Sequence, residues 1–191
     1  MDKVRETALK ILYKIDKENA YSNIVLDDEI NKNRSKLNER DIGLISEIIY
    51  GTTTWKLTID EIIKKHSKIK LKKYSKWILN IIRMGIYQIV FLDKIPKSAA
   101  VNESVNLCKK YGYKSVGFVN AILRKVDKSD YEEFKKIKDN NERISKMYSM
   151  PEWIVKKLVK QYGISNVHWL SSKQAAKVIE GLKSIQEKDK K

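Results

Sequence analysis

The side chains in this sequence that could do chemistry are above all lysines, gathered in two segments. From Lys64 to Lys76 the chain carries seven lysines and no acidic residue, and a second basic group lies at the N-terminus. Lysine ammonium groups meet phosphate as flexible point charges, which gives affinity for nucleic acid without reading its sequence. With two basic residues near a later helix end, they form the predicted RNA-binding set: Lys3, Arg5, Lys10, Lys64, Lys65, Lys68, Lys70, Lys72, Lys73, Lys76, Arg124 and Lys125.

The charge of the whole chain favours the same interpretation. Its 40 Lys and Arg outnumber 24 Asp and Glu, a formal charge of +16, and such an excess points to nucleic acid or another anionic surface. An alternative stays open, because lysine in excess of arginine also occurs where lysines only solvate helix faces or a loop. Sequence preference would need aromatic stacking partners, and six tyrosines could either stack on bases or edge the core: Tyr13, Tyr21, Tyr50, Tyr74, Tyr111 and Tyr113.

Residue types suited to catalysis or metal binding are sparse. Cys108 is the single cysteine and lies on the apolar side of a predicted helix, where burial would raise its pKa and keep it inert. His66 and His168 are far apart and lack the companions of a zinc site or a hydrolytic triad. The sequence has no glycine-rich turn of the kind that cradles a nucleotide cofactor. We therefore predict no catalytic, cofactor-binding or metal-binding residue.

The elements that must position the lysines are helices. Apolar residues recur at spacings of three and four from Val4 to Ile15 and in several later segments, which is the pattern of amphipathic helices. Only two prolines and seven glycines interrupt the chain, so an all-α bundle is predicted. Gly85 lies inside the most apolar run and indicates a close helix crossing, while Pro96 suits the first turn of the following helix.

Composition divides the chain into three parts. We expect a helical RNA-binding domain over residues 1–127, a charged linker over 128–148, and a helical extension with a lysine-rich tail over 149–191. The N-terminus lacks the apolar core of a signal peptide. The run from Ile78 to Leu92 is too short and too polar to span a bilayer. A cytoplasmic protein that does not bind membranes is therefore predicted.

Several short motifs occur in a characteristic order. They are Arg5–Tyr13, Asn38–Asp41, Glu47–Thr52, Arg83–Gln88, Ile95–Glu103, Phe118–Lys125 and Ser149–Trp153. In this order and spacing the chain resembles the NusB-like RNA-binding domain at the front of bacterial B-type 16S ribosomal RNA cytosine-5 methyltransferases (the Sun/Fmu family). The Pro-Glu-Trp motif at Pro151 matters most, because free NusB antitermination factors resemble only the helical bundle.

The resemblance implies two three-helix sub-bundles that bind RNA, with ribosomal RNA as the expected partner. Members of the family continue into a domain that binds S-adenosylmethionine and use two catalytic cysteines, and this sequence shows neither feature. Our leading hypothesis is an RNA-binding portion of such a methyltransferase without catalysis of its own. Two alternatives stay open: an antitermination-type module that binds RNA and a ribosomal protein, and an RNA-targeting subunit that works with a separate methyltransferase chain.

Overall fold

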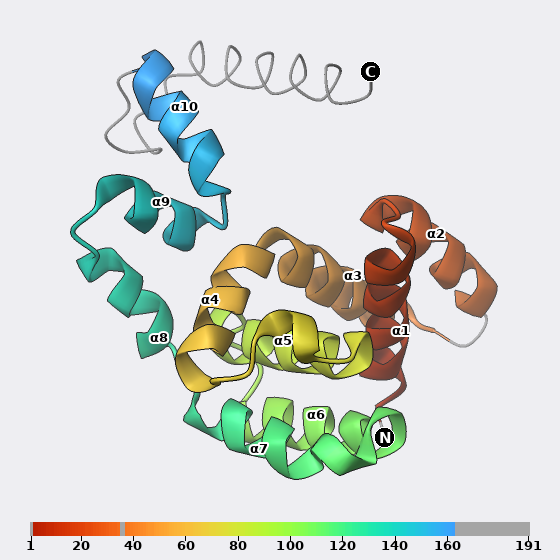
Figure 1. Cartoon of the computed structure of the whole chain (residues 1–191). Coiled ribbons are helices and arrows are strands. Elements are labelled where there is room, and N and C mark those ends of the chain that lie inside the picture. The colour runs from red at the N-terminus through yellow and green to blue at the C-terminus, as the bar shows by residue number, and fades with distance from the viewer. Residues whose placement is uncertain (1, 35–36, 163–191) are drawn as a thin grey trace. The chain divides into compact units, whose positions relative to one another are not determined.

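The computed structural model describes residues 2–34 and 37–162, and within these ranges it contains α-helices and short 3₁₀ turns but no strand (Figure 1). The predicted all-α class is confirmed. Residues 163–191 of the predicted helical extension, with His168, lie outside the described residues. The helices are α1 (Lys3–Glu18), α2 (Ser22–Asn33), α3 (Glu39–Thr54), α4 (Lys56–His66), α5 (Lys76–Phe91), α6 (Lys97–Tyr111), α7 (Val116–Lys125), α8 (Ser129–Glu132), α9 (Asn140–Tyr148) and α10 (Glu152–Tyr162).

Side-chain caps explain where three of the helices begin. The carboxylate of Asp2 accepts a hydrogen bond from the amide of Val4 at the start of α1 (2.9 Å). Asn38 and Asp41 form a reciprocal capping box at the start of α3. The hydroxyl of Ser75 caps α5. Each cap satisfies amides of a first turn that have no partner within the helix.

The core is built around α5, in which every residue from Asn80 to Val90 is buried. Figure 1 shows α5 between α3 and α4 on one side and α6 and α7 on the other, and it also contacts α1. The predicted close crossing at Gly85 is confirmed, because a Cβ built there would lie 2.8 Å from Leu123 Cδ1 and from Ser104 Oγ. Helices α1–α3 contact one another, as do α5–α7, which agrees with two three-helix groups.

Some expectations about single residues are corrected by the structure. Ile24, an apolar residue of α2, is 54% exposed, because Val25 and Leu26 form the buried face. Arg83, a charged residue in the most apolar run of the chain, lies in the middle of α5 and is buried. The pairing that permits this burial is a hydrogen-bonded ion pair with Asp60.

The chain forms two compact units, Met1–Glu133 and Phe134–Lys191. The first unit therefore extends past the boundary predicted at residue 127 and includes α8. The segment predicted as a charged linker contains α8, a 3₁₀ turn over Glu133–Lys136, and α9. In the second unit, α9 and α10 pack against each other. Among the described residues, no helix has both the length and the apolar character needed to cross a bilayer.

Candidate nucleic-acid interface

The segment between α4 and α5, residues 67–75, forms an ordered basic loop. Its backbone makes a 3₁₀ turn over Leu71–Lys73. The hydroxyl of Tyr74 donates to Ser67 Oγ (2.7 Å), and the ring of Tyr74 lies against Phe118 of α7, with centroids 5.6 Å apart. Four side chains of this loop are exposed and make no hydrogen bond or ion pair with the described part of the chain: Lys68, Lys70, Lys72 and Lys73.

The lysines at the two ends of this run are paired. Lys64 contacts Glu61 (2.5 Å), Lys65 bridges two carboxylates of the α8 region, and Lys76 donates to the carbonyl oxygen of Asp16 (2.8 Å). Arg124 and Lys125, at the C-terminal end of α7, are exposed and make no polar contact with the described residues. The basic loop and the end of α7 therefore carry the free cations on this part of the first unit.

The predicted role of Arg5 is revised. Its guanidinium is only 11% exposed and pairs with Asp2, and its Nε donates to Gln88 Oε1 of α5 (2.6 Å). These contacts join α1 to the central helix. These contacts favour a structural role for Arg5 over the predicted contact with RNA.

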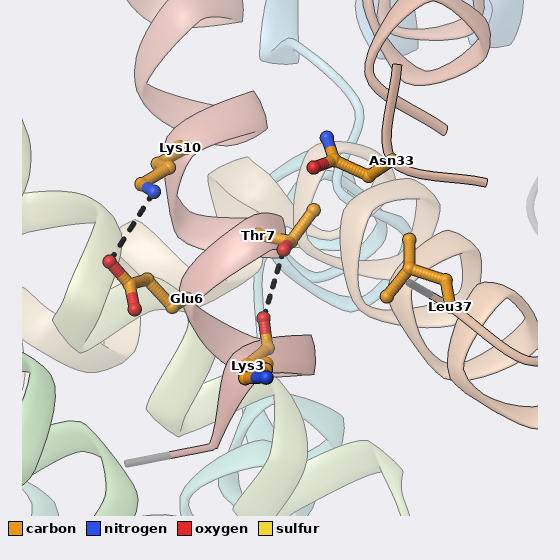
Figure 2. A pocket seen from close by; sticks show the side chains of 6 residues that line it. All are labelled: Lys3, Glu6, Thr7, Lys10, Asn33 and Leu37. Carbon is orange, nitrogen blue, oxygen red and sulfur yellow. Dashed lines mark hydrogen bonds and ion pairs between the residues drawn. The ribbon is translucent and has the colours of Figure 1, made fainter. Parts of the chain in front are cut away.

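A small pocket lies beside the first two turns of α1 (Figure 2). It has a cavity volume of about 130 Å³ and is lined by Lys3, Glu6, Thr7, Lys10, Asn33 and Leu37. Figure 2 shows the hydroxyl of Thr7 bonded to the carbonyl oxygen of Lys3 and the ammonium of Lys10 close to Glu6. The side chain of Lys3 makes no polar contact with the described residues. The pocket thus brings two predicted RNA-binding lysines, Lys3 and Lys10, to one place.

The carboxylate of Glu6 organises the cations between α1 and α6. Its Oε1 accepts hydrogen bonds from Lys110 Nζ (2.7 Å) and from the hydroxyl of Tyr111 (2.6 Å), and Lys10 Nζ lies 3.4 Å away. The bonds from Lys110 and Tyr111 outweigh the cost of burial, and the pKa of Glu6 falls from 4.5 to about 2. Glu6 is therefore ionised at neutral pH and holds Lys10 and Lys110 side by side.

Replacing Glu6 by glutamine should lower the free energy of unfolding at pH 7 by about 2 kcal/mol, a value that allows for the exposed lysine partners. Because folding depresses the pKa of Glu6, its contribution is present above pH 4.5 and is lost as the pH falls toward 2. Urea unfolding of wild type and E6Q from pH 7 to pH 2 measures the difference. A difference in stability that stays constant across this range would contradict the assignment.

Three aromatic side chains from three helices form a continuous stack. The rings of Tyr13 and Trp77 lie 3.8 Å apart at an interplanar angle of 5°, and those of Trp77 and Tyr111 lie 4.5 Å apart at 22°. All three residues are half-buried. We call these residues the aromatic stack. The sequence indicates Tyr13 and Tyr111 as stacking candidates but does not indicate that Trp77 lies between them. The order of the three rings depends on contacts between helices that are distant in the sequence. A short stretch of sequence therefore does not predict it.

A second cluster fastens α8 to the end of α4. Asp130 is buried and receives Lys65 Nζ (2.7 Å), while His66 Nε2 lies 2.9 Å from its other oxygen. Burial raises the pKa of Asp130, but the bonds from Lys65, the Asp127 amide and His66 outweigh it, and the net shift is downward. The side chains of His66 and Lys65 are therefore both engaged in contacts with Asp130. Among the described residues, no group of three or more His, Cys, Asp or Glu is arranged to hold a metal ion.

The cysteine behaves as the sequence predicted. Cys108 is fully buried in α6, and its thiol lies 3.3 Å from the carbonyl oxygen of Gly112. Burial raises the pKa of this thiol, so the reactive thiolate is disfavoured at neutral pH. Cys108 is a small core residue.

Among known protein families, the NusB family matches residues 2–128 of this chain. These residues contain all of α1 to α7. The chain belongs to the NusB family. The basic loop, the pocket, the Glu6 contacts and the aromatic stack all lie within the NusB region.

Two kinds of curated NusB-related proteins are similar to the chain. A probable ribosomal RNA small subunit methyltransferase B of Bacillus subtilis (strain 168) is 34% identical over 182 residues, which are 92% of this chain and 40% of the relative. A transcription antitermination protein NusB of Ruminiclostridium cellulolyticum is 39% identical over 132 residues, which are 66% of this chain and 87% of the relative. The chain thus spans about two fifths of the length of the methyltransferase relatives that it matches.

A solved structure shares the fold of the aligned part of this chain. It is described as the crystal structure of a plectonemic RNA supercoil, and its chain aligns with a TM-score of 0.60 and 22% identity, over 69% of this chain and 94% of that chain.

The pocket beside α1 does not fit S-adenosylmethionine, because its volume of about 130 Å³ is well below the roughly 300 Å³ at which pockets for such ligands begin.

Proposed function

We propose that the first unit binds RNA through basic residues of the basic loop, the α1 pocket, the end of α6, and the end of α7 with Arg124 and Lys125. The observation that carries the proposal is the basic loop, because four neighbouring lysines without an acidic partner extend from an ordered backbone. The loop that carries these lysines is held by the hydrogen bond from the Tyr74 hydroxyl to Ser67 Oγ. Membership of the NusB family and the RNA-containing structure with the same fold support the proposal.

Binding of this kind must depend on salt. Each phosphate that a lysine neutralises releases a condensed counterion, and for single strands the log–log slope is about −0.7 per phosphate. Contacts with four to six phosphates would give a slope of roughly −3 to −4. The net charge of +16 adds a long-range attraction that is screened over about 8 Å at physiological ionic strength.

The test compares two charge-reversal variants of equal charge. The double variant K70E/K72E should weaken binding to a ribosomal RNA stem-loop and make the salt slope shallower by about 1.4, since two phosphate contacts are lost. The control variant K94E/K97E changes the same charge on exposed lysines that lie beyond the opposite end of α5. Fluorescence anisotropy titrations from 50 to 300 mM salt give both slopes. Equal slopes for the two variants, or no binding by wild type at low salt, would refute the proposal.

For the target we propose RNA of the small ribosomal subunit. The alignment with the methyltransferase relative is 182 residues long, so it continues beyond the NusB region of residues 2–128 into the second unit, where Pro151 and Trp153 lie. We accordingly propose that the chain is the RNA-targeting portion of a small-subunit methyltransferase or works with a separate catalytic chain. Competition should favour small-subunit RNA fragments over transfer RNA of equal length, and equal competition would contradict this target.

A second candidate function is favoured by the antitermination relatives. The alignment with the R. cellulolyticum protein covers 87% of that protein. In this case the first unit would act as an interaction module that binds RNA together with a ribosomal protein. Affinity purification distinguishes the two candidates. Stoichiometric recovery of a ribosomal protein, with weak binding to RNA alone, would favour the antitermination-type module over the methyltransferase-type role.

A further inference from the structure

The exposed side of α10, in the second unit, combines one large aromatic ring with lysines. Trp153 is 51% exposed. Lys157 and Lys160 are also exposed and follow it at i+4 and i+7, so the three side chains lie on one face of the helix. Val155 and Leu158, on the opposite face, are buried. We call Trp153, Lys157 and Lys160 the α10 face.

The charges of the second unit leave the α10 face positive. Residues 134–162 carry eight Lys and Arg against three Asp and Glu. Each of the three carboxylates has a partner at α9 or within α10: Asp139 caps α9, and ion pairs join Glu142 to Lys146 and Glu152 to Lys156. Lys157 and Lys160 make no hydrogen bond or ion pair with the described part of the chain. Their charge is therefore available to an anionic ligand.

The ring and the ammonium groups lie close enough to act on one ligand. The ammonium of Lys157 is 5.8 Å from the centroid of the Trp153 ring, which is a cation–π contact. An exposed ring beside ammonium groups offers the two features that bind single-stranded nucleic acid, a platform for stacking and contacts with phosphate. A purely acidic peptide would use the lysines but leave the indole uncovered, so the combination favours a nucleotide ligand.

We propose that the α10 face is a second RNA-binding site, outside the NusB region of residues 2–128. Trp153 stacks on an unpaired base, and Lys157 and Lys160 contact phosphates of the same strand. This inference rests on the proposed RNA-binding function and adds to it a site on the second unit, into which the alignment with the methyltransferase relative continues.

The experiment measures the occupancy of the α10 face directly in the full chain. The probe is an oligouridylate of about 12 nucleotides that contains 4-thiouridine, a length that suits a single-strand site. Ultraviolet light crosslinks it to side chains that contact its bases. The tryptic peptide 147–156 contains Trp153, so the yield of this crosslinked peptide at increasing RNA concentration gives the apparent Kd of the α10 face. We expect a crosslink that saturates.

Charge-reversal variants test the lysines while Trp153 is kept. The variant K157E/K160E should weaken the crosslink and make its salt slope shallower by about 1.4, since two phosphate contacts are lost. The variant K94E/K97E changes the same charge on exposed lysines of the first unit and should leave the crosslink unchanged. The variant K70E/K72E, in the basic loop, should also leave it unchanged.

Tryptophan fluorescence tests the stacking. The oligouridylate should quench the fluorescence of wild type, and part of this quenching should be absent in W153F. Inorganic polyphosphate carries no base, so it should compete for the lysines without producing that part of the quenching. If polyphosphate quenched Trp153 as strongly as the oligouridylate, stacking on a base would be refuted.

The outcomes distinguish this site from the proposed function. If wild type binds no RNA at low salt, both are refuted. If RNA binding is weakened by K70E/K72E but peptide 147–156 is not crosslinked, only the site on α10 is overturned. Equal crosslinking in K157E/K160E and K94E/K97E also overturns it. Quenching of Trp153 by polyglutamate at lower concentrations than by the oligouridylate would assign the α10 face to an acidic protein partner and overturn RNA binding there.

Discussion

Replacement of Arg83 by leucine should lower the free energy of unfolding by about 3–5 kcal/mol, because it leaves a buried charge without its partner. Arg83 forms two parallel hydrogen bonds to Asp60, Nε to Oδ1 at 2.7 Å and Nη2 to Oδ2 at 2.8 Å. Its Nη1 also donates to Asp16 Oδ2 at 2.9 Å. The guanidinium thus joins α5 to α4 and α1. Urea unfolding followed by circular dichroism at 222 nm measures the loss.

The double variant R83L/D60L supplies the control. It removes both members of the buried pair and fills the space with apolar groups, which is often nearly neutral for buried ion pairs. We expect the double variant to be more stable than R83L, since no unpaired carboxylate of Asp60 remains. If the stability losses of R83L and D60L added up to the loss of the double variant, Arg83 and Asp60 would not be energetically coupled.

Replacement of Gly51 by alanine should destabilise the chain by about 3 kcal/mol, at the upper end of the usual range for overpacking. A Cβ at this position of α3 would overlap the ring carbons and the hydroxyl oxygen of Tyr87. The ring cannot move freely, because Tyr87 is buried and its hydroxyl donates to Glu47 Oε1 (2.5 Å). Thermal unfolding compared with wild type measures the effect.

The same helix offers a matched control at Gly43. A Cβ there meets no atom within 4 Å, so G43A should raise stability by about 0.5–1 kcal/mol through helix propensity alone. Tyr87→Leu should be less harmful in the G51A background than in wild type, because it removes the overlapping ring. If G51A and G43A changed stability in the same direction, the close contact of Gly51 with Tyr87 would be contradicted.

Local pattern was sufficient to predict most of the fold. The helix face from Val4 to Ile15, the capping box at Asn38 and the crossing at Gly85 are recorded within a few neighbouring residues, and the structure confirms each. The burial of Cys108 followed in the same way from the apolar side of its helix. These features depend on periodicity and backbone sterics, which short stretches of sequence express directly.

The contacts of the candidate site were less predictable, because they join segments far apart. The positive charge of Arg5 suggested RNA binding, yet its partner Gln88 is 83 residues away. Arg83 in an apolar run could have indicated a buried partner, since buried arginines require pairing, but the sequence does not identify Asp60. Which lysines are free depends on the positions of Glu61, Asp130 and Glu133, and these are set by tertiary packing.

The contacts of α1 also determine when the chain can fold during synthesis. The amide of Asp2 bonds to Glu103 and the carboxylate of Glu6 to Tyr111, over sequence separations of 101 and 105 residues. At translation rates of about 5–20 residues per second, the first helix leaves the ribosome roughly 5–20 seconds before its partners exist. The side of α1 that meets α5 and α6 stays uncovered for that interval, whereas its contacts with α2 and α3 can form earlier in synthesis.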